Sequence, residues 1–458
     1  MNGLLEQKDF QRFTLGNKQY VFLTGSQQTL EITTPEMDTY FKMCAGEQVG
    51  LPLDNLIVAK LTSVLKGLKA IPTDDYSTSK QVMLTLNTTH GCNMACKYCF
   101  ASTLKDRQNV MPLSVVRKSI QNLIENNKSA EQYIIYFFGG EPLLHKQFIR
   151  EAVEIAKEEI LSKHNKKVRF LLNTNATLMD KATLEFFKNK NFTITVSIDG
   201  PEHANDLNRI FLNGRSSFNR VMKGIDLLKE YGIRFNLRAT FNPKATYLVE
   251  IFKFFEGLKV PYSYAFAISA KEKELCETHF NDEDIARFDK ELETVMGYLL
   301  SKIANDDTVY CTDFLKKLET LKHRSVRLHG CEAGRNSLIV NEAGAYYVCQ
   351  NMLPFAETAV GNLSKGIDTN KLNQFSSKEV KNLPICQQCW ARYLCGGGCE
   401  AERYLTENET NEFTQRCKLT QLEWKHFIQT YIKMNDLINN KFNNKKELNY
   451  GRFEKVRA

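Results

Sequence analysis

Apolar residues follow two different repeats along the chain. From residue 81 onward, short and nearly continuous apolar runs alternate with longer segments whose apolar residues recur every three or four positions. The runs predict buried strands, and the longer segments predict amphipathic helices. Buried strands separated by helices are typical of a parallel sheet built from right-handed βαβ units, so we expect an α/β fold. The predicted strands are 81–89, 133–140, 168–175, 192–199, 234–241 and 262–269.

Six strands are two fewer than a closed (β/α)8 barrel has, so the pattern predicts a partial (β/α)6 TIM-like barrel over residues 81–310. In parallel sheets, ligands bind beyond the carboxyl ends of the strands, which makes the residues just after each strand the first to inspect. The helices are expected near 112–127, 146–162, 181–188, 216–231, 246–257 and 281–305.

The chain before the barrel has a different pattern. Two β-rich runs, 13–24 and 28–34, precede two segments with helical spacing, 35–44 and 53–71. This order predicts a small α+β module of winged-helix type over residues 1–72. A stretch rich in Pro, Asp and Ser follows it and is interpreted as a linker at 73–80.

Composition narrows the functional class. The 458 residues include 13 cysteines and carry a formal net charge of +8, and much of the excess lies in a basic tail, 431–458, without apolar periodicity. We interpret this tail as a solvated end, and expect no nucleic-acid partner. The start lacks the apolar stretch of a signal peptide, and no window approaches about 18 apolar residues, so we expect a cytoplasmic protein without a membrane partner. In a reducing compartment, many cysteines favour metal binding or catalysis over disulfides.

Three cysteines follow the first barrel strand. Cys92, Cys96 and Cys99 have the spacing C-x3-C-x2-C. Three thiolates on one loop can hold three irons of a [4Fe–4S] cluster and leave the fourth iron open to a ligand. The alternative is a zinc site completed by His90.

With Tyr98 before the last cysteine, this motif resembles that of the radical S-adenosylmethionine (SAM) enzymes. The resemblance implies that an electron passes from the cluster to SAM and that the resulting 5′-deoxyadenosyl radical abstracts a hydrogen atom from a substrate. The loop after the second strand looks like the family's GGEP loop, which receives the methionine amino group, and Arg209 is placed to pair with the methionine carboxylate. The residues implied to bind SAM are Tyr98, Gly139, Gly140, Glu141, Pro142, Asn175, Ser197, Asp199 and Arg209.

A second series of cysteines fills the last third of the chain and resembles the seven-cysteine SPASM extension of radical SAM enzymes, here 311–430. The resemblance implies two auxiliary [4Fe–4S] clusters, three clusters in all. One is assigned to Cys386, Cys389, Cys395 and Cys417. The other is assigned to Cys331, Cys349 and Cys399, which leaves one ligand missing.

Three interpretations of the missing fourth ligand stay open. Cys311 could supply it, the iron could be open, or a substrate thiolate could bind there. Cys44 and Cys276 are interpreted as core residues. Zinc sites of four cysteines would also explain the C-x2-C spacing, although not its combination with the first motif.

The resemblance extends to maturases of ribosomally made peptides that form thioether cross-links, such as the SCIFF maturases and the quinohemoprotein amine dehydrogenase maturases. It implies a precursor peptide whose leader adds a strand to the N-terminal module, as in peptide-recognition elements of the RRE type. A flavodoxin or ferredoxin is the expected electron donor.

Three rival functions remain. A maturase that joins carbon to carbon shares every motif. An anaerobic sulfatase-maturing enzyme usually has an Asp after the second SPASM cysteine and a close cysteine pair at the first, whereas here Gln350 and Asn351 follow Cys349. An iron–sulfur winged-helix regulator would need a basic helix that the module lacks. No catalytic residue is assigned, and Asp199, Glu141, His90 and Tyr264 are all plausible bases by position.

Overall fold

The computed structural model describes residues 4–67, 80–99, 109–268, 278–376, 378–405 and 411–444. Cys276, most of the predicted linker and the chain after residue 444 lie outside these ranges.

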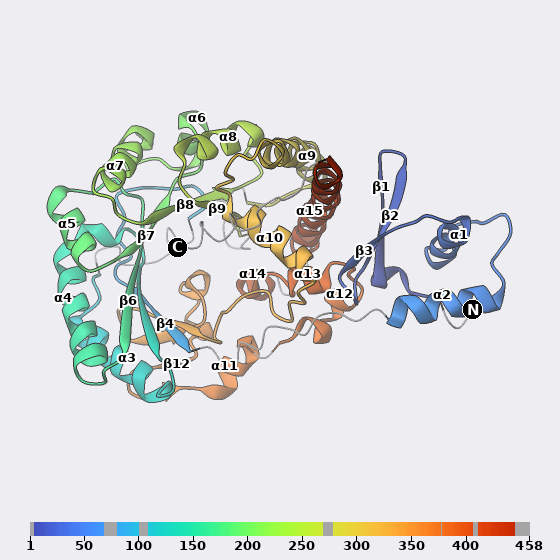
Figure 1. Cartoon of the computed structure of the whole chain (residues 1–458). Coiled ribbons are helices and arrows are strands. Elements are labelled where there is room, and N and C mark those ends of the chain that lie inside the picture. Colours follow the sequence, from blue (N-terminus) through green and yellow to red (C-terminus); the bar gives the residue numbers. More distant parts are fainter. Residues whose placement is uncertain are drawn as a thin grey trace.

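A curved sheet forms the centre of the molecule (Figure 1). All six predicted strands are present and pair in sequence order in parallel, which confirms the α/β fold and the partial barrel. Their bounds are β4 (Gln81–Asn87), β5 (Gln132–Phe138), β6 (Lys167–Thr174), β7 (Thr193–Ser197), β8 (Phe235–Phe241) and β9 (Tyr262–Phe266).

The helices between these strands cover the outer side of the sheet (Figure 1). Their apolar faces pack against strand residues such as Ile135, Leu172 and Leu237, which have no exposed surface. The helices are α3 (Leu113–Asn126), α4 (Lys146–Ala156), α5 (Lys181–Asn189), α7 (Phe218–Glu230) and α8 (Leu248–Leu258). A further short helix, α6 (Glu202–Asn208), was not predicted and lies between β7 and α7.

The sheet continues beyond the predicted barrel. Strand β10 (Ser337–Val340) pairs in parallel with β4, and β11 (Ala345–Tyr347), β12 (Gly361–Asn362) and β13 (Gly366–Ile367) follow in antiparallel order. The result is a ten-stranded sheet in the order β13-β12-β11-β10-β4-β5-β6-β7-β8-β9. The cysteine-rich part of the chain is therefore built onto the first barrel strand.

The N-terminal module has the predicted order of strands before helices. Its elements are β1 (Phe10–Leu15), β2 (Lys18–Leu23), β3 (Gln28–Glu31), α1 (Pro35–Cys44) and α2 (Asn55–Gly67). The first predicted run is a hairpin of two strands, so the antiparallel sheet has three strands in the order β1-β2-β3. Thr34 caps α1 by accepting a hydrogen bond from Met37 N–H.

Side chains alternate across the two faces of the module's sheet. Val21 and Leu23 face the helices and form a small separate core with Tyr40. Tyr20 and Phe22 belong to the main core, and the Phe22 ring meets the Trp390 ring edge-on at 6.0 Å. The module is thus attached to the cysteine-rich region through one face of its sheet.

Long helices complete the structure. Helix α9 (Asp282–Ala304) begins with a capping box formed by Asn281 and Asp284, and α10 (Thr312–Lys322) and α15 (Asn411–Asn444) follow. The prediction of a tail starting at residue 431 is wrong for its first part, because α15 continues to Asn444 and buries Ile432. None of the helices in the described ranges is long and apolar enough to cross a membrane.

Candidate active site and cysteine centres

The loop after β4 carries the first three cysteines and is held by the loop after β5. Gly140 N–H donates to Thr89 O, and Glu141 N–H donates to Gly91 O, both at 2.8 Å. A Cβ atom on Gly140 would lie 2.0 Å from Gly91 O, and one on Gly139 would lie 2.4 Å from Thr89 O. The two glycines, predicted to let the backbone approach a ligand, here let two loops approach each other.

The segment after α6 holds the same loop from another side. Ala95 N–H donates to Ile210 O at 2.8 Å, and Lys97 N–H donates to Asn208 O at 3.1 Å. Met94 also forms an antiparallel bridge with Phe211. The cysteine loop is therefore fixed by backbone hydrogen bonds to the loop after β5 and to the end of α6.

Cys92, Cys96 and Cys99 come together on this loop. The Cys96 thiol has Cys92 and Cys99 among its electrostatic neighbours, and the Cys92 thiol has Cys99. Burial raises the pKa of both thiols to about 12. Thiolates in such a place need cations beside them, which is the environment that a bound iron–sulfur cluster provides.

Glu141 has a structural role in addition to its predicted one. Its carboxylate accepts hydrogen bonds from Leu143 N–H at 2.9 Å, Asn175 N–H at 2.7 Å and the Thr174 hydroxyl at 2.8 Å. It thereby starts the 3-10 turn that begins at Pro142 and ties the end of β5 to the end of β6. Burial outweighs these bonds and raises the pKa of Glu141 to about 7.

Asn175 and Ser197 lie at neighbouring strand ends, as predicted. Asn175 Nδ2 is 2.9 Å from Asn93 Oδ1 and 4.0 Å from Cys92 Sγ. Ser197 is the buried last residue of β7. Asn93 was not predicted, and its only signal in the sequence is its position directly after Cys92.

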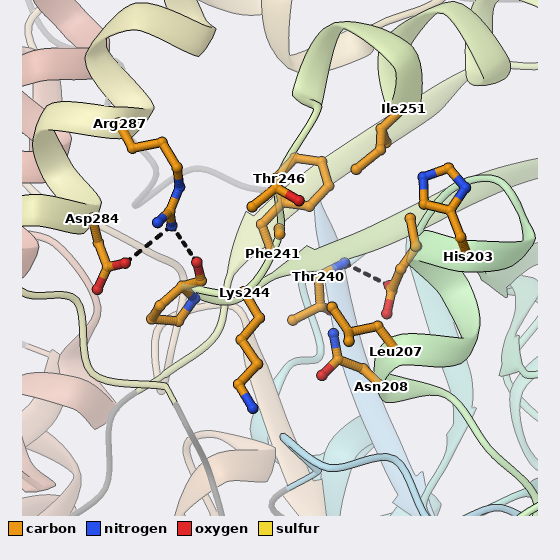
Figure 2. Close-up of a pocket in the computed structure, with 14 residues that line it drawn as sticks. His203, Leu207, Asn208, Thr240, Phe241, Lys244, Thr246, Ile251, Asp284 and Arg287 are labelled. Atoms are coloured by element: carbon orange, nitrogen blue, oxygen red, sulfur yellow. Dashed lines mark hydrogen bonds and ion pairs between the residues drawn. The ribbon is translucent and has the colours of Figure 1, made fainter.

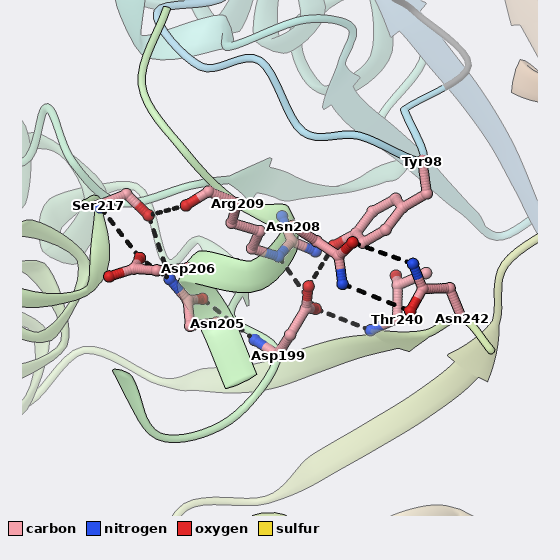
Figure 3. Close-up of polar contacts among 9 residues, drawn as sticks. All are labelled: Tyr98, Asp199, Asn205, Asp206, Asn208, Arg209, Ser217, Thr240 and Asn242. Carbon is pink, nitrogen blue, oxygen red and sulfur yellow. Dashed lines mark hydrogen bonds and ion pairs between the residues drawn. The ribbon is translucent and has the colours of Figure 1, made fainter. Parts of the chain in front are cut away.

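Three predicted residues, buried Asp199 and Arg209 and partly buried Tyr98, form one group (Figure 3). The Tyr98 hydroxyl donates to Asp199 Oδ2 at 2.5 Å, and Arg209 Nε forms an ion pair with Asp199 Oδ1 at 3.0 Å. The guanidinium also lies over the Tyr98 ring, with its central carbon 5.4 Å from the ring centroid. Thr240 N–H donates to Asp199 at 2.9 Å. The partner of Arg209 in this structure is therefore Asp199, which joins the cysteine loop to β7 and β8.

A cavity of about 500 Å³ borders this group at the carboxyl ends of β7 and β8. Asp199 and Thr240 form part of its wall, and Figure 2 shows Phe241 and Ile251 lining it. Arg287 closes one side through an ion pair with Asp284 at 3.0 Å. Its size and position are those of a small-molecule pocket in a parallel α/β fold.

The C-terminal cysteines separate into the two predicted sets. The Cys399 thiol has Cys349 and Cys331 among its electrostatic neighbours, and Cys349 has Cys331. The Cys417 thiol instead has Cys395, Cys389 and Cys386. Within the first of these sets Cys331 is exposed, whereas Cys349 and Cys399 are partly covered.

The run Gly396–Gly398 separates the two sets. All three glycines have positive φ angles, and a Cβ on Gly396 would lie 2.3 Å from His329 O. On the facing segment, a Cβ on Gly330 would lie 1.8 Å from Gly398 O. The backbone before Cys331 therefore packs directly onto the backbone between Cys395 and Cys399.

Cys311 lies in a different environment. It is fully buried in the main core, and it forms a parallel bridge with Tyr262 of β9. The strongest electrostatic neighbours of its thiol are Asp313 and Glu256, and the structure does not bring it into the Cys331 set. This placement favours a core residue over a fourth ligand.

The zinc alternative for the first motif is not favoured. His90 Nε2 lies 3.0 Å from Glu342 Oε2, so the predicted fourth zinc ligand already pairs with a carboxylate. In the ranges that the structure describes, no three His, Cys, Asp or Glu side chains converge as one metal ion requires. A cubane cluster needs no such convergence, because each thiolate binds its own iron.

The hydroxyl of Tyr264, another candidate base from the sequence, is already hydrogen-bonded. Its hydroxyl donates to Glu423 of α15 at 2.6 Å in a buried position. Lys317 pairs with the same carboxylate. The two bonds join β9 and α10 to α15.

Residues 86–249 match the model of the radical SAM superfamily. The chain carries a radical SAM domain. The cofactors of a radical SAM enzyme are SAM and a [4Fe–4S] cluster, and the partly buried cysteine loop with its surrounding strand ends fits both.

Curated relatives extend the likeness beyond this domain. A cysteine-type anaerobic sulfatase-maturating enzyme of Clostridium perfringens is 25% identical over 359 residues, which cover 74% of this chain and 93% of the relative. A serine-type anaerobic sulfatase-maturating enzyme of Bacteroides thetaiotaomicron is 25% identical over 348 residues, covering 68% and 81%.

Solved structures show the same fold. The native anSMEcpe structure with bound AdoMet superposes with a TM-score of 0.65 at 22% identity, covering 79% of this chain and all of that one. Streptococcus suis SuiB bound to its precursor peptide SuiA gives a TM-score of 0.50 at 15% identity, covering 87% and 96%. The sulfatase-maturating enzymes, placed behind the cross-linking maturases on sequence patterns, are thus the stronger match, and the peptide maturase is a distant one.

Proposed function

We propose that this radical SAM enzyme oxidises a residue of a precursor peptide and closes an intramolecular cross-link from a cysteine sulfur to a carbon. The observation that carries the proposal is the Cys331 set, which brings together three thiols and leaves one of them, Cys331, at the surface. A site with three protein ligands keeps a position for a fourth from outside.

The barrel residues have defined tasks in this proposal. Cys92, Cys96 and Cys99 would hold the first cluster, which with SAM supplies the radical that removes a hydrogen atom from the peptide. Glu141, Asn175, Ser197 and the Tyr98–Asp199–Arg209 group keep the surrounding strand ends in place. Because most of these side chains are buried, water is excluded from the reacting atoms.

The Cys331 set would act on the acceptor sulfur. Cys331, Cys349 and Cys399 would hold an auxiliary cluster, and a peptide thiol that enters beside the exposed Cys331 would lose its proton there. Forming the carbon–sulfur bond removes one hydrogen from carbon and one from sulfur. The set of Cys386, Cys389, Cys395 and Cys417 would hold the other auxiliary cluster, through which the remaining electron could leave to a flavodoxin or ferredoxin.

The N-terminal module supplies an edge for a leader peptide. Ile32 N–H donates to Gln19 O, and hydrogen bonding alternates along an antiparallel pair. By this alternation, Thr29 and Glu31 direct their backbone groups away from β2, to the outer edge of the module's sheet. A groove of about 350 Å³ runs beside this edge, with Leu321 of α10 and Tyr431 of α15 in its opposite wall.

A single substitution tests the edge. In Thr29→Pro the outward N–H is lost while the hydrogen bonds to β2 remain, so leader binding should weaken about tenfold or more if a strand adds there. Thr29→Val keeps the N–H and is the matched control. Equal affinity of both variants for the labelled leader, measured by fluorescence anisotropy, would refute strand addition at β3.

Mass spectrometry tests the reaction itself. The reconstituted enzyme is incubated anaerobically with SAM, a reductant and the short peptide encoded beside the gene. We expect 5′-deoxyadenosine and a peptide lighter by two hydrogens, with one cysteine protected from alkylation. The same mass loss with every cysteine still alkylatable would replace the thioether by a carbon–carbon link.

Formylglycine formation is the second candidate, because the sulfatase-maturating relatives are matched over most of their length. Two features oppose it: Gln350 and Asn351 replace the expected Asp, and no second cysteine lies close to Cys331. Asn351 Nδ2 instead lies 3.7 Å from Cys349 Sγ. A peptide product that loses the sulfur of one cysteine and reacts with a hydrazine would establish this reaction.

A further inference from the structure

One buried cation has no role in the proposed reaction. Arg403 lies on α14 (Glu400–Leu405), the short helix that directly follows Cys399, and it is 5% exposed. Its Nη1 donates to Gly397 O at 3.2 Å, and its Nη2 forms an ion pair with Glu400. The side chain therefore packs under the glycine run that separates the two C-terminal cysteine sets.

The position of Arg403 between the sets is visible in its surroundings. Its strongest favourable electrostatic neighbours are Cys386 and Cys395 of one set and Cys331 and Cys399 of the other. A Cβ on Gly397 would come within 3.2 Å of Nη1, so the turn leaves just enough room for the guanidinium. No other residue of α14 reaches both sets with a positive charge.

One donor of this side chain is unsatisfied. Nε of Arg403 is buried and has no hydrogen-bond partner among the described residues. A buried donor without an acceptor costs free energy, so a bound group that supplies an acceptor is favoured there. Clusters bound by the two cysteine sets would bring sulfur acceptors and negative charge to this place.

We propose that Arg403 is the positive charge shared by the two auxiliary clusters, and that it raises the reduction potential of both. The inference rests on the proposed function, since it requires clusters in both sets. Arginine keeps its charge at every accessible pH, and a fixed cation stabilises the reduced, more negative state of a cluster beside it. One guanidinium beside both clusters would shift the two potentials in the same direction.

The test measures potentials and not turnover. Cys92, Cys96 and Cys99 are replaced by alanine in the full chain, so that only the auxiliary clusters contribute to the electron paramagnetic resonance signals. In this background Arg403→Gln should shift both midpoint potentials to more negative values. Arg403→Lys, which keeps the charge, should leave both near the parent values. Arg392→Gln is the control, since Arg392 neighbours Cys389 of only one set.

The outcomes separate the inference from the proposed function. If the parent variant without the Cys92, Cys96 and Cys99 thiols binds no iron–sulfur cluster, both the auxiliary clusters of the proposed function and the role of Arg403 are refuted. Clusters whose potentials do not move in Arg403→Gln, or move equally in Arg403→Lys, would overturn the inference alone. If Arg403→Gln does not fold, Glu400→Gln leaves the guanidinium in place without its counterion, and both potentials should rise; unchanged potentials would again overturn it.

Discussion

The two cysteine-bearing regions are ordered in different ways. The Cys92 loop is held by backbone hydrogen bonds to Gly140 and Glu141 after β5 and to Asn208 and Ile210 at the end of α6. The C-terminal sets are gathered by 3-10 turns, four-residue helices and a run of glycines with positive φ. The barrel can therefore shape its site before a cluster binds, whereas the C-terminal region depends on its clusters to keep its thiols in place.

The largest expected effect comes from removing one cysteine of each region. Cys96→Ser should abolish 5′-deoxyadenosine formation while the unfolding temperature changes little, because the loop keeps its backbone bonds. Cys395→Ser should instead allow SAM cleavage but lose product, and should lower the unfolding temperature. Both are measured by chromatography and calorimetry on reconstituted protein, and equal destabilisation by the two substitutions would refute the comparison.

On the barrel side, buried Glu141 should make the stability of the protein depend on pH. Its pKa of about 7 in the folded protein lies above the usual 4.5, so the native state binds this proton more tightly than the unfolded state does. The contribution of this proton to the free energy of unfolding is largest below pH 4.5 and is lost as the pH rises toward 7. Relative to Glu141→Gln, the free energy of unfolding of the wild type should fall by on the order of 3 kcal/mol over that range. Denaturant unfolding at pH 5 and pH 8 measures the change; a constant difference would contradict it.

A glycine substitution tests how closely the barrel loops touch. Gly140→Ala would place its Cβ 2.0 Å from the backbone oxygen of Gly91, and we expect a loss of about 1–3 kcal/mol in the free energy of unfolding. Gly257 in α8 has no atom within 4 Å of its virtual Cβ, so Gly257→Ala should be neutral or slightly stabilising. Chemical denaturation of both variants decides whether close approach is the reason for the glycine.

The smallest effect is expected where the N-terminal module meets the cysteine-rich region. Arg392 donates to Lys8 O at 2.7 Å and pairs with Asp9 at 2.8 Å, next to Cys389. Arg392→Ala should cost about 1 kcal/mol, since Asp9 is partly exposed. A double-mutant cycle with Asp9→Ala isolates the pair, and a coupling energy of zero would show that the Arg392–Asp9 ion pair does not help to attach the module.

Features that depend on a short stretch of sequence could be predicted. Each barrel strand has its own apolar run, and the resemblance of the cysteine motifs to known families implied the three cysteine sets. Strands β10 to β13 were missed because they have only two to four residues each, too few for a periodic signal. The partner of Arg209 and the environment of Arg403 were also not predictable, because both are created by segments that meet only after folding.

The pairing of β10 with β4 has a consequence for any attempt to divide the protein. The motif boundary near residue 310 suggests a place to cut, yet a fragment that ended there would leave β4 as a bare edge strand directly before Cys92. Unprotected edges of this kind recruit strands from other molecules. We therefore expect a truncated barrel to aggregate during expression, and the two halves to be obtainable only as one polypeptide.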